Sequence, residues 1–313
     1  MYQILLIIGG LTLLVLGGNW LLKSAVALSL KFGVPKIVVG MTVVSFATSA
    51  PELIVSLSAA MDGHADLALG NVIGSNIANL GLVLAVTLIV GGMEVNKNFY
   101  TTDWPVMMLS SLIFFGFAYF DQTLQRWEGA VMVGLLFLFL VYLLRFQKTA
   151  VLDERPEDDL PLPLYLMVLY LGLGGAALWG GSELLIKGAV NVALLYGIGE
   201  RTIAVTVVSV GTSVPELAAS VIAAVKKEKA ISLGNLIGSN IFNLLAVLGF
   251  TALITPIQVV DNDLMHHDVF WMLGLSFLIL PLVFFPKGLH LGWKDGIVLL
   301  LCYAIFLYSM GIG

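Results

Sequence analysis

Two short polar stretches interrupt apolar regions of the chain and carry the residue types most able to do chemistry. Residues 48–52 read TSAPE, and residues 212–216 read TSVPE. Each stretch combines a carboxylate and two hydroxyls with a proline, which has no N–H and breaks or kinks a helix just before it. A charged side chain at the centre of a bilayer costs at least ~2.5 kcal/mol. Neither stretch holds a Lys or Arg, so Glu52 and Glu216 need a neutralising partner from solution, either a cation or a proton.

The oxygen atoms around the two glutamates favour a hard cation. Ser49 and Thr48 precede Glu52 by three and four residues, so their side chains can converge. A helix broken at each proline adds free backbone carbonyls. Ca²⁺ takes about 6–8 oxygen ligands and Na⁺ suits the same donors, whereas no sulfur or histidine is present to favour zinc or copper. The candidate ligands are Glu52, Thr48, Ser49, Ser75 and Asn79 and their counterparts Glu216, Thr212, Ser213, Ser239 and Asn243.

The composition requires membrane helices to position these side chains. The 313 residues are 59% hydrophobic and only 11% charged, whereas soluble proteins are about 25% charged. Long apolar runs of roughly 20 residues favour transmembrane helices over the short alternating strands of a barrel. We expect an all-α polytopic membrane protein with ten transmembrane helices, near residues 3–29, 37–60, 68–91, 104–120, 127–146, 163–193, 201–225, 231–254, 267–285 and 293–312.

The two halves of the chain repeat each other at an offset of 164 residues. Residues 42–53 and 206–217 share nine of twelve positions, and residues 69–80 and 233–244 share ten of twelve. The similarity covers residues 17–85 and 181–249 without a gap. It predicts two five-helix repeats, 1–146 and 163–313, joined by a linker at 147–162. Because five is odd, the repeats must insert with opposite orientation, the inverted-topology arrangement of secondary transporters.

The distribution of basic residues predicts the orientation. With the N-terminus outside, twelve of the 15 Lys and Arg residues fall on the cytoplasmic side, and only Arg126, Lys187 and Arg201 remain outside. Cytoplasmic loops carry the excess of Lys and Arg. We therefore expect a multi-pass protein of the cell membrane with both termini outside and the 147–162 linker in the cytoplasm.

The paired motifs resemble the α-repeats of the calcium/cation antiporter superfamily, in particular its prokaryotic sodium/calcium exchanger branch. The resemblance implies that spans 2, 3, 7 and 8 form an ion-binding core near the middle of the membrane, while spans 1 and 6 slide across it to alternate access. It implies that Glu52 and Glu216 bind Ca²⁺ and Na⁺ alternately. Carbonyls of Thr48 and Thr212 would help with Ca²⁺. Hydroxyls of Ser49, Ser75, Ser213 and Ser239, and carbonyls of Ser45 and Ser209, would help with Na⁺.

One position departs from some members of that superfamily. Those members have an aspartate at the position of Asn243, whereas both Asn79 and Asn243 are amides here. The site charge of −2 balances one Ca²⁺ or two protons, which leaves the Na⁺ stoichiometry open. The expected function is Na⁺/Ca²⁺ antiport by alternating access. An H⁺/Ca²⁺ antiporter with the same glutamates carrying protons is the alternative, and a Glu-lined channel is a third.

No enzymatic activity, resident cofactor, nucleic acid or obligate protein partner is expected, since Ca²⁺ and Na⁺ would be the substrates and the lipid bilayer the surroundings. Three further features have structural interpretations. Glu183 and Lys187 are four residues apart and predict an ion pair on one helix face. Cys302 is expected to be a buried thiol, and Gly70 and Gly74 to allow close helix packing. A cluster at Asp261, Asp263, His266, His267 and Asp268 could suggest a metal site, but predicts a polar loop and helix cap.

Overall fold

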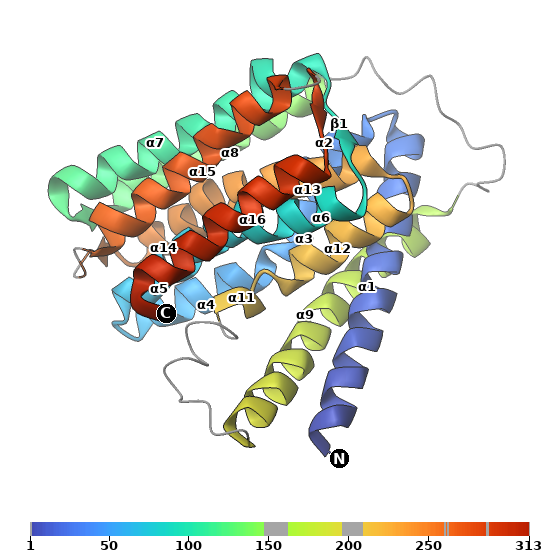
Figure 1. The fold of residues 1–313 in the computed structure, drawn as a ribbon. Coiled ribbons are helices and arrows are strands. Elements are labelled where there is room, and N and C mark those ends of the chain that lie inside the picture. The colour runs from blue at the N-terminus through green and yellow to red at the C-terminus, as the bar shows by residue number, and fades with distance from the viewer. Residues whose placement is uncertain are drawn as a thin grey trace.

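The computed structural model describes residues 2–146, 162–195, 209–259, 261, 263–285 and 288–312, and these residues form an all-α bundle (Figure 1). The expected linker at 147–162 lies almost entirely outside the described residues. The helices of the first half are α1 (Tyr2–Phe32), α2 (Lys36–Val39), α3 (Ser45–Thr48), α4 (Ala50–Met61), α5 (Ala65–Ala78), α6 (Ala85–Val90), α7 (Trp104–Asp121) and α8 (Arg126–Phe146).

The second half contains α9 (Leu164–Leu195), α11 (Ser209–Gly211), α12 (Val214–Val225), α13 (Lys229–Phe242), α14 (Gly249–Ile254), α15 (Val269–Phe284) and α16 (Trp293–Leu307). Short π-helical turns connect or extend several of these helices: η1 (Gly40–Val44), η2 (Asn79–Leu84), η3 (Phe99–Asp103), η6 (Asn243–Leu248), η7 (Leu264–Asp268) and η8 (Tyr308–Ile312).

The helices are long and apolar enough for a polytopic membrane protein. Within the described ranges, eight helices meet the length and composition needed to cross a membrane, and a ninth crossing results if the bent pair Lys36–Thr48 and Ala50–Met61 is one span. The remaining expected span, 201–225, is described only from Ser209 and includes the short apolar helix α12. The expected number of ten therefore stays a prediction.

The most buried helices are α5–η2–α6 and α13–η6–α14, which run through the centre of the bundle. Large apolar side chains on surrounding helices, such as Phe120 and Phe137, are exposed, as expected for surfaces that face lipid. Cys302 on α16 is partly exposed, so the expectation of a fully buried thiol was wrong.

Two pairs of very short strands join loops of the two halves. β1 (Met93–Glu94) pairs antiparallel with β4 (His290–Leu291), and β2 (Thr123–Leu124) pairs antiparallel with β3 (Ile257–Gln258). Strands of two residues carry no recognisable sequence pattern, so they could not be expected from the sequence.

The close approach of α13 to α2 and η1 depends on glycines. A Cβ added to Gly238 would lie 2.6 Å from the Cα of Met41, and one added to Gly234 would meet the Ile37 carbonyl. Gly74, which matches Gly238 in the first half, has no described atom within 4 Å of an added Cβ. The residue that would match Met41, at position 205, lies outside the described residues, so the packing role expected for Gly70 and Gly74 is not seen.

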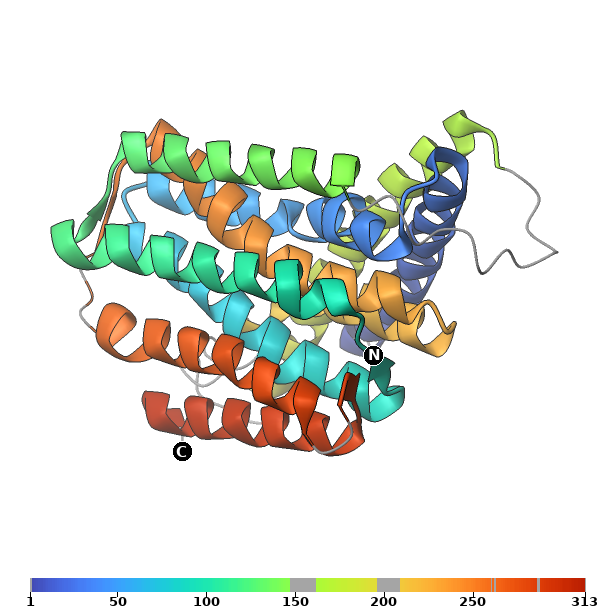
Figure 2. The ribbon, with the colours of Figure 1, turned by 90° about the horizontal axis from the view of Figure 1, so that it is seen from above.

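Helices α1 and α9 form a separate pair at one side of the bundle (Figures 1 and 2). Glycines bring the two backbones together at several points along the pair. A Cβ on Gly10 would lie 2.7 Å from the Gly181 carbonyl oxygen, and a Cβ on Gly17 would lie 2.8 Å from that of Gly174. Because backbone atoms occupy this space, no side chain fits without moving one helix away from the other.

Substitution of Gly17 by Ala should therefore destabilise the α1–α9 pair. Overpacking costs about 1–3 kcal/mol, which predicts a fall in Tm of about 3–10 °C for purified protein in detergent. Gly180→Ala is the matched control, because an added Cβ there meets nothing within 4 Å in the described structure. Equal Tm values for the two variants would contradict the close-packed crossing.

Candidate ion-binding site

The first of the two polar stretches forms a break in the helix, as expected. Helix α3 ends at Thr48 and α4 begins at Ala50, and the two axes differ by 45°. Ser49 lies at the break, and Pro51 occupies the first turn of α4. In the second half, α11 ends at Gly211 and α12 begins at Val214, again with a proline in the first turn.

Each break places a glutamate in the first turn of the following helix. Glu52 lies at the start of α4 and Glu216 at the start of α12, and both side chains are completely buried. A helix N-terminus favours negative charge through its free N–H groups. Ser49, at the break that precedes Glu52, contacts the Glu216 carboxylate, so the two breaks meet at one place.

The carboxylate oxygens are largely uncommitted within the described part of the chain. The Ser49 hydroxyl donates to Oε1 of Glu216 at 3.3 Å. Oε2 of Glu216 and both carboxylate oxygens of Glu52 have no hydrogen-bond partner there, and neither has the buried Ser213 hydroxyl. The described ranges also contain no buried Lys or Arg side chain. Buried charges are normally paired, and among the described residues this pair of carboxylates has no basic partner.

Hydroxyl groups join the two halves at this position. The hydroxyls of Thr48 and Ser239 lie 3.4 Å apart, and those of Ser75 and Thr212 lie 3.1 Å apart. Thr48 and Thr212, and likewise Ser75 and Ser239, are separated by 164 residues. The same contact is therefore made twice, each time between a broken helix of one half and a central helix of the other.

The two amides predicted as ligands begin π-helical turns. Asn79 is the first residue of η2 and Asn243 the first residue of η6. Oδ1 and Nδ2 of Asn79 and Oδ1 of Asn243 are buried without a partner among the described residues, while Nδ2 of Asn243 donates to Oδ1 of Asn76 at 3.1 Å. Such turns occur often at functional sites.

Ser45 and Ser209 are the remaining residues that the sequence predicted for the site. The Ser45 hydroxyl donates to the carbonyls of Gly40 (2.9 Å) and Asn235 (3.0 Å), so it is committed to packing. The Ser45 carbonyl accepts the Ser49 N–H at 2.9 Å. Ser209 begins α11, and its side chain lies outside the described residues.

Sequence reasoning missed three buried or half-buried asparagines beside these residues: Asn71, Asn76 and Asn235. Asn71 donates to the Ser56 hydroxyl at 2.9 Å, and Asn235 donates to the Ser220 hydroxyl at 3.0 Å. The Asn76 amide donates to the carbonyl of Asn240 at 3.3 Å. Their repetition is a sequence signal that could have identified them, because Asn71 matches Asn235 and Asn76 matches Asn240 at the offset of 164 residues.

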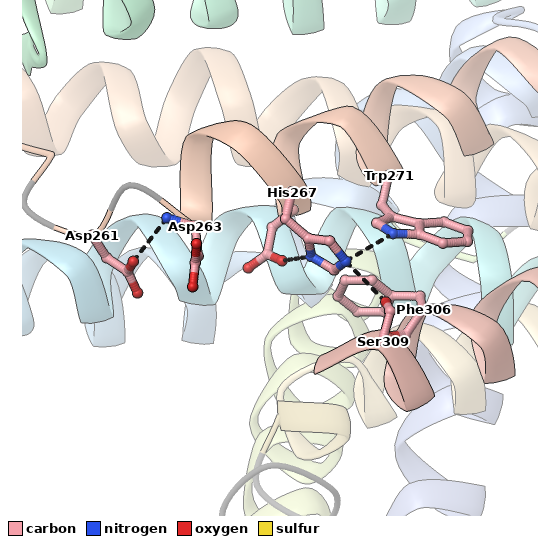
Figure 3. Close-up of polar contacts among 7 residues, drawn as sticks. Asp261, Asp263, His267, Trp271, Phe306 and Ser309 are labelled. Carbon is pink, nitrogen blue, oxygen red and sulfur yellow. Dashed lines mark hydrogen bonds and ion pairs between the residues drawn. The ribbon is translucent and has the colours of Figure 1, made fainter. Parts of the chain in front are cut away.

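The cluster before α15 forms two separate sets of hydrogen bonds, one around His267 and one between Asp261 and Asp263 (Figure 3). Nδ1 of His267 lies 2.7 Å from Oδ1 of Asp268, and its Nε2 lies 2.9 Å from the Ser309 hydroxyl and accepts the Trp271 indole N–H at 3.1 Å. Asp261 accepts the N–H of Asp263 at 2.9 Å. Among the described residues, no three His, Cys, Asp or Glu side chains are grouped to hold a metal. The set around His267 joins the start of α15 to the turn after α16.

Two ion pairs lie away from the buried carboxylates. Glu183 and Lys187 are 3.4 Å apart on α9, which confirms the ion pair predicted from their spacing. Both side chains are mostly exposed, and exposed pairs contribute little stability. Lys36 and Glu228 lie 2.9 Å apart and connect the start of α2 to the loop before α13.

Comparison with known proteins identifies the family of the chain. The sodium/calcium exchanger protein family matches residues 2–145 and 166–311. The chain is 35% identical to a putative antiporter, CaxA, of Alkalimonas amylolytica over 96% of each chain, and 30% identical to the sodium/calcium exchanger MaX1 of Methanosarcina acetivorans over 97% of each chain. Its fold matches that of the sodium-calcium exchanger NCX_Mj with a TM-score of 0.82 and 28% identity, over 99% of each chain. The chain therefore belongs to the sodium/calcium exchanger family and is a multi-pass membrane protein of that antiporter fold.

Proposed function

We propose that the protein exchanges Na⁺ for Ca²⁺ across the membrane by alternating access at a site built on Glu52 and Glu216. The observation that carries this proposal is the buried pair of carboxylates with no basic partner in the described structure. Among the described residues, three of their four oxygens have no hydrogen-bond partner, which supports coordination of an ion. The relatives MaX1 and NCX_Mj are themselves named as sodium/calcium exchangers, which supports the choice of ions.

The charge of the site explains why transport would be exchange. Without a bound cation, two carboxylates in a medium of low dielectric constant repel each other, and moving them across the membrane is costly. Either one Ca²⁺ or a set of Na⁺ ions neutralises them. A carrier that changes its access only when neutral must therefore carry one ion set in each direction.

The neighbouring oxygens complete a site for a hard cation. We assign coordination to Asn79 and Asn243, to the hydroxyls of Ser49, Ser75, Ser213 and Ser239, and to the carbonyls of Ser45, Thr48, Ser209 and Thr212. The amide oxygens of Asn79 and Asn243 and the Ser213 hydroxyl, which have no partner among the described residues, support this set. The reciprocal contacts Thr48–Ser239 and Ser75–Thr212 support two equivalent repeats of opposite orientation around one site. We also propose that the protein lies in the cell membrane, with both termini outside and the linker in the cytoplasm.

Proton coupling is the second candidate function. Asn79 and Asn243 are uncharged amides, so the two glutamates give the site a charge of −2. One Ca²⁺, two protons or Na⁺ ions can balance that charge. Glu52 and Glu216 would then carry the protons, and the fold and the site would be unchanged.

The driving ion can be measured in proteoliposomes. Vesicles loaded with Na⁺ and diluted into Na⁺-free buffer at equal pH should take up ⁴⁵Ca²⁺, and collapse of the Na⁺ gradient should stop the uptake. A parallel set of vesicles with a pH gradient and no Na⁺ should show only background. Uptake only in the vesicles with a pH gradient would contradict Na⁺ coupling and support the H⁺/Ca²⁺ antiporter.

Removing either carboxylate charge should abolish transport. Glu52→Gln and Glu216→Gln keep the side-chain shape but leave one negative charge, so Ca²⁺ would be bound without neutrality. We expect Na⁺-driven ⁴⁵Ca²⁺ uptake to fall at least about 100-fold for either variant, since loss of about 3 kcal/mol of binding corresponds to that factor. Glu183→Gln, at the exposed ion pair of α9, is the control and should transport normally. Near-normal uptake by either site variant, with elution and Tm as for the unmodified protein, would refute the site.

A further inference from the structure

Asn235 connects the first helix break to two helices of the second half. Its amide nitrogen donates to the Ser220 hydroxyl of α12 at 3.0 Å, and its amide oxygen accepts the Thr48 hydroxyl of α3 at 3.2 Å. Its backbone carbonyl accepts the Ser45 hydroxyl at 3.0 Å. Three helices, α3, α12 and α13, which lie side by side in Figure 1, therefore meet at one buried side chain.

The geometry of an amide makes this contact directional. An asparagine presents its donor and its acceptor in one plane and in fixed relation. Because Ser220 holds the nitrogen end, the oxygen end points at Thr48. Thr48 is the last residue of α3, directly before Ser49, whose hydroxyl donates to Glu216. A bond that holds the Thr48 side chain therefore also restrains the backbone at the break between α3 and α4.

Asn71 occupies the matching position and makes one of the two matching side-chain contacts. Its amide nitrogen donates to the Ser56 hydroxyl at 2.9 Å, as that of Asn235 donates to Ser220, and it also lies 3.4 Å from the Glu52 carbonyl. In the described structure, Thr212 contacts Ser75 as Thr48 contacts Ser239, but Thr212 makes no bond to Asn71 that would match the Thr48–Asn235 bond. The Ser213 hydroxyl, which matches that of Ser49, has no described partner. Among the described residues, the break in the first half is therefore held from across the site by Asn235, and no bond from Asn71 to Thr212 holds the break in the second half.

We propose that Asn235 is a positioning residue of the ion site, which orients Thr48 and Ser49 at the helix break without itself contacting the ion. This proposal rests on the proposed function, because it assigns the broken helix an ion-binding role. In the described conformation, Asn71 does not orient Thr212 in this way. Asn235 therefore contributes to Ca²⁺ affinity in this conformation and Asn71 contributes mainly to the packing of α4 on α5.

Ca²⁺ binding separates a positioning role from a general loss of structure. Equilibrium ⁴⁵Ca²⁺ binding to purified protein in Na⁺-free buffer should show an affinity about tenfold lower for Asn235→Ala, with an unchanged number of sites, since partners of metal ligands typically contribute 10–100-fold. Asn71→Ala should change the affinity less than about threefold, and Asn98→Ala, at an exposed position, should not change it. Equal losses for Asn71→Ala and Asn235→Ala, or a loss of sites without a change in affinity, would overturn the proposal.

Thermal unfolding tests the contact without any ion, so it decides the proposal even if the protein transports something else. The fall in Tm for Asn235→Ala combined with Thr48→Val should be smaller than the sum of the two single falls, because both variants remove the same hydrogen bond. The falls for Asn71→Ala and Thr212→Val should add. Additive falls for the first pair would show that Asn235 does not hold Thr48.

A second variant covers the case in which Asn235→Ala yields too little folded protein. Ser220→Ala frees the same amide and should weaken Ca²⁺ binding in the same direction. Unchanged affinity would count against the proposal.

Discussion

The structure depends on two buried carboxylates that the described protein leaves without a positive partner. Glu52 and Glu216 lie at helix N-termini in the centre of the bundle, and the dipoles of those helices offset only part of the cost of burial. Removing a carboxylate from water costs several kcal/mol, and two adjacent carboxylates cost more. We propose that a cation from solution balances this charge, since the described residues supply no buried basic partner, and this gives the bundle its proposed role as a carrier.

The rest of the architecture brings oxygen atoms to these carboxylates. Pro51 and Pro215 lie in the first turn of the helix after each break, and a proline donates no hydrogen bond to the carbonyl four residues before it. In the second half that carbonyl, of Gly211, accepts the Ser182 hydroxyl at 2.7 Å instead. Glycines at 234 and 238 let α13 approach the first helix break closely enough for Thr48 to reach Ser239 and Asn235. The glycine contacts between α1 and α9 keep the outer pair joined as one unit beside this core.

The sequence predicted the class of protein, the break at Ser49 and the burial of both glutamates, because a doubled Pro-Glu motif in an apolar chain permits few other arrangements. It could not predict which oxygens meet. Ser49 was expected beside Glu52 on its own helix, but its hydroxyl bonds to Glu216 across the site. The π-helical turns that begin at Asn79 and Asn243 were also missed, since one extra residue in a helical turn leaves no trace in hydrophobic periodicity. Asn235 could have been found from its repetition as Asn71, but its contact with Thr48 required the packing of three helices.

The most direct measurement is the number of monovalent cations released when Ca²⁺ binds to purified protein, recorded with Na⁺- and pH-sensitive electrodes. If solution cations balance Glu52 and Glu216, each Ca²⁺ bound in Na⁺ buffer should release Na⁺, and each Ca²⁺ bound in Na⁺-free buffer should release protons. Glu52→Gln and Glu216→Gln should reduce both signals. Binding of Ca²⁺ with release of neither ion would show that the charge of the two carboxylates is balanced within the protein, and would contradict the exchange mechanism at its origin.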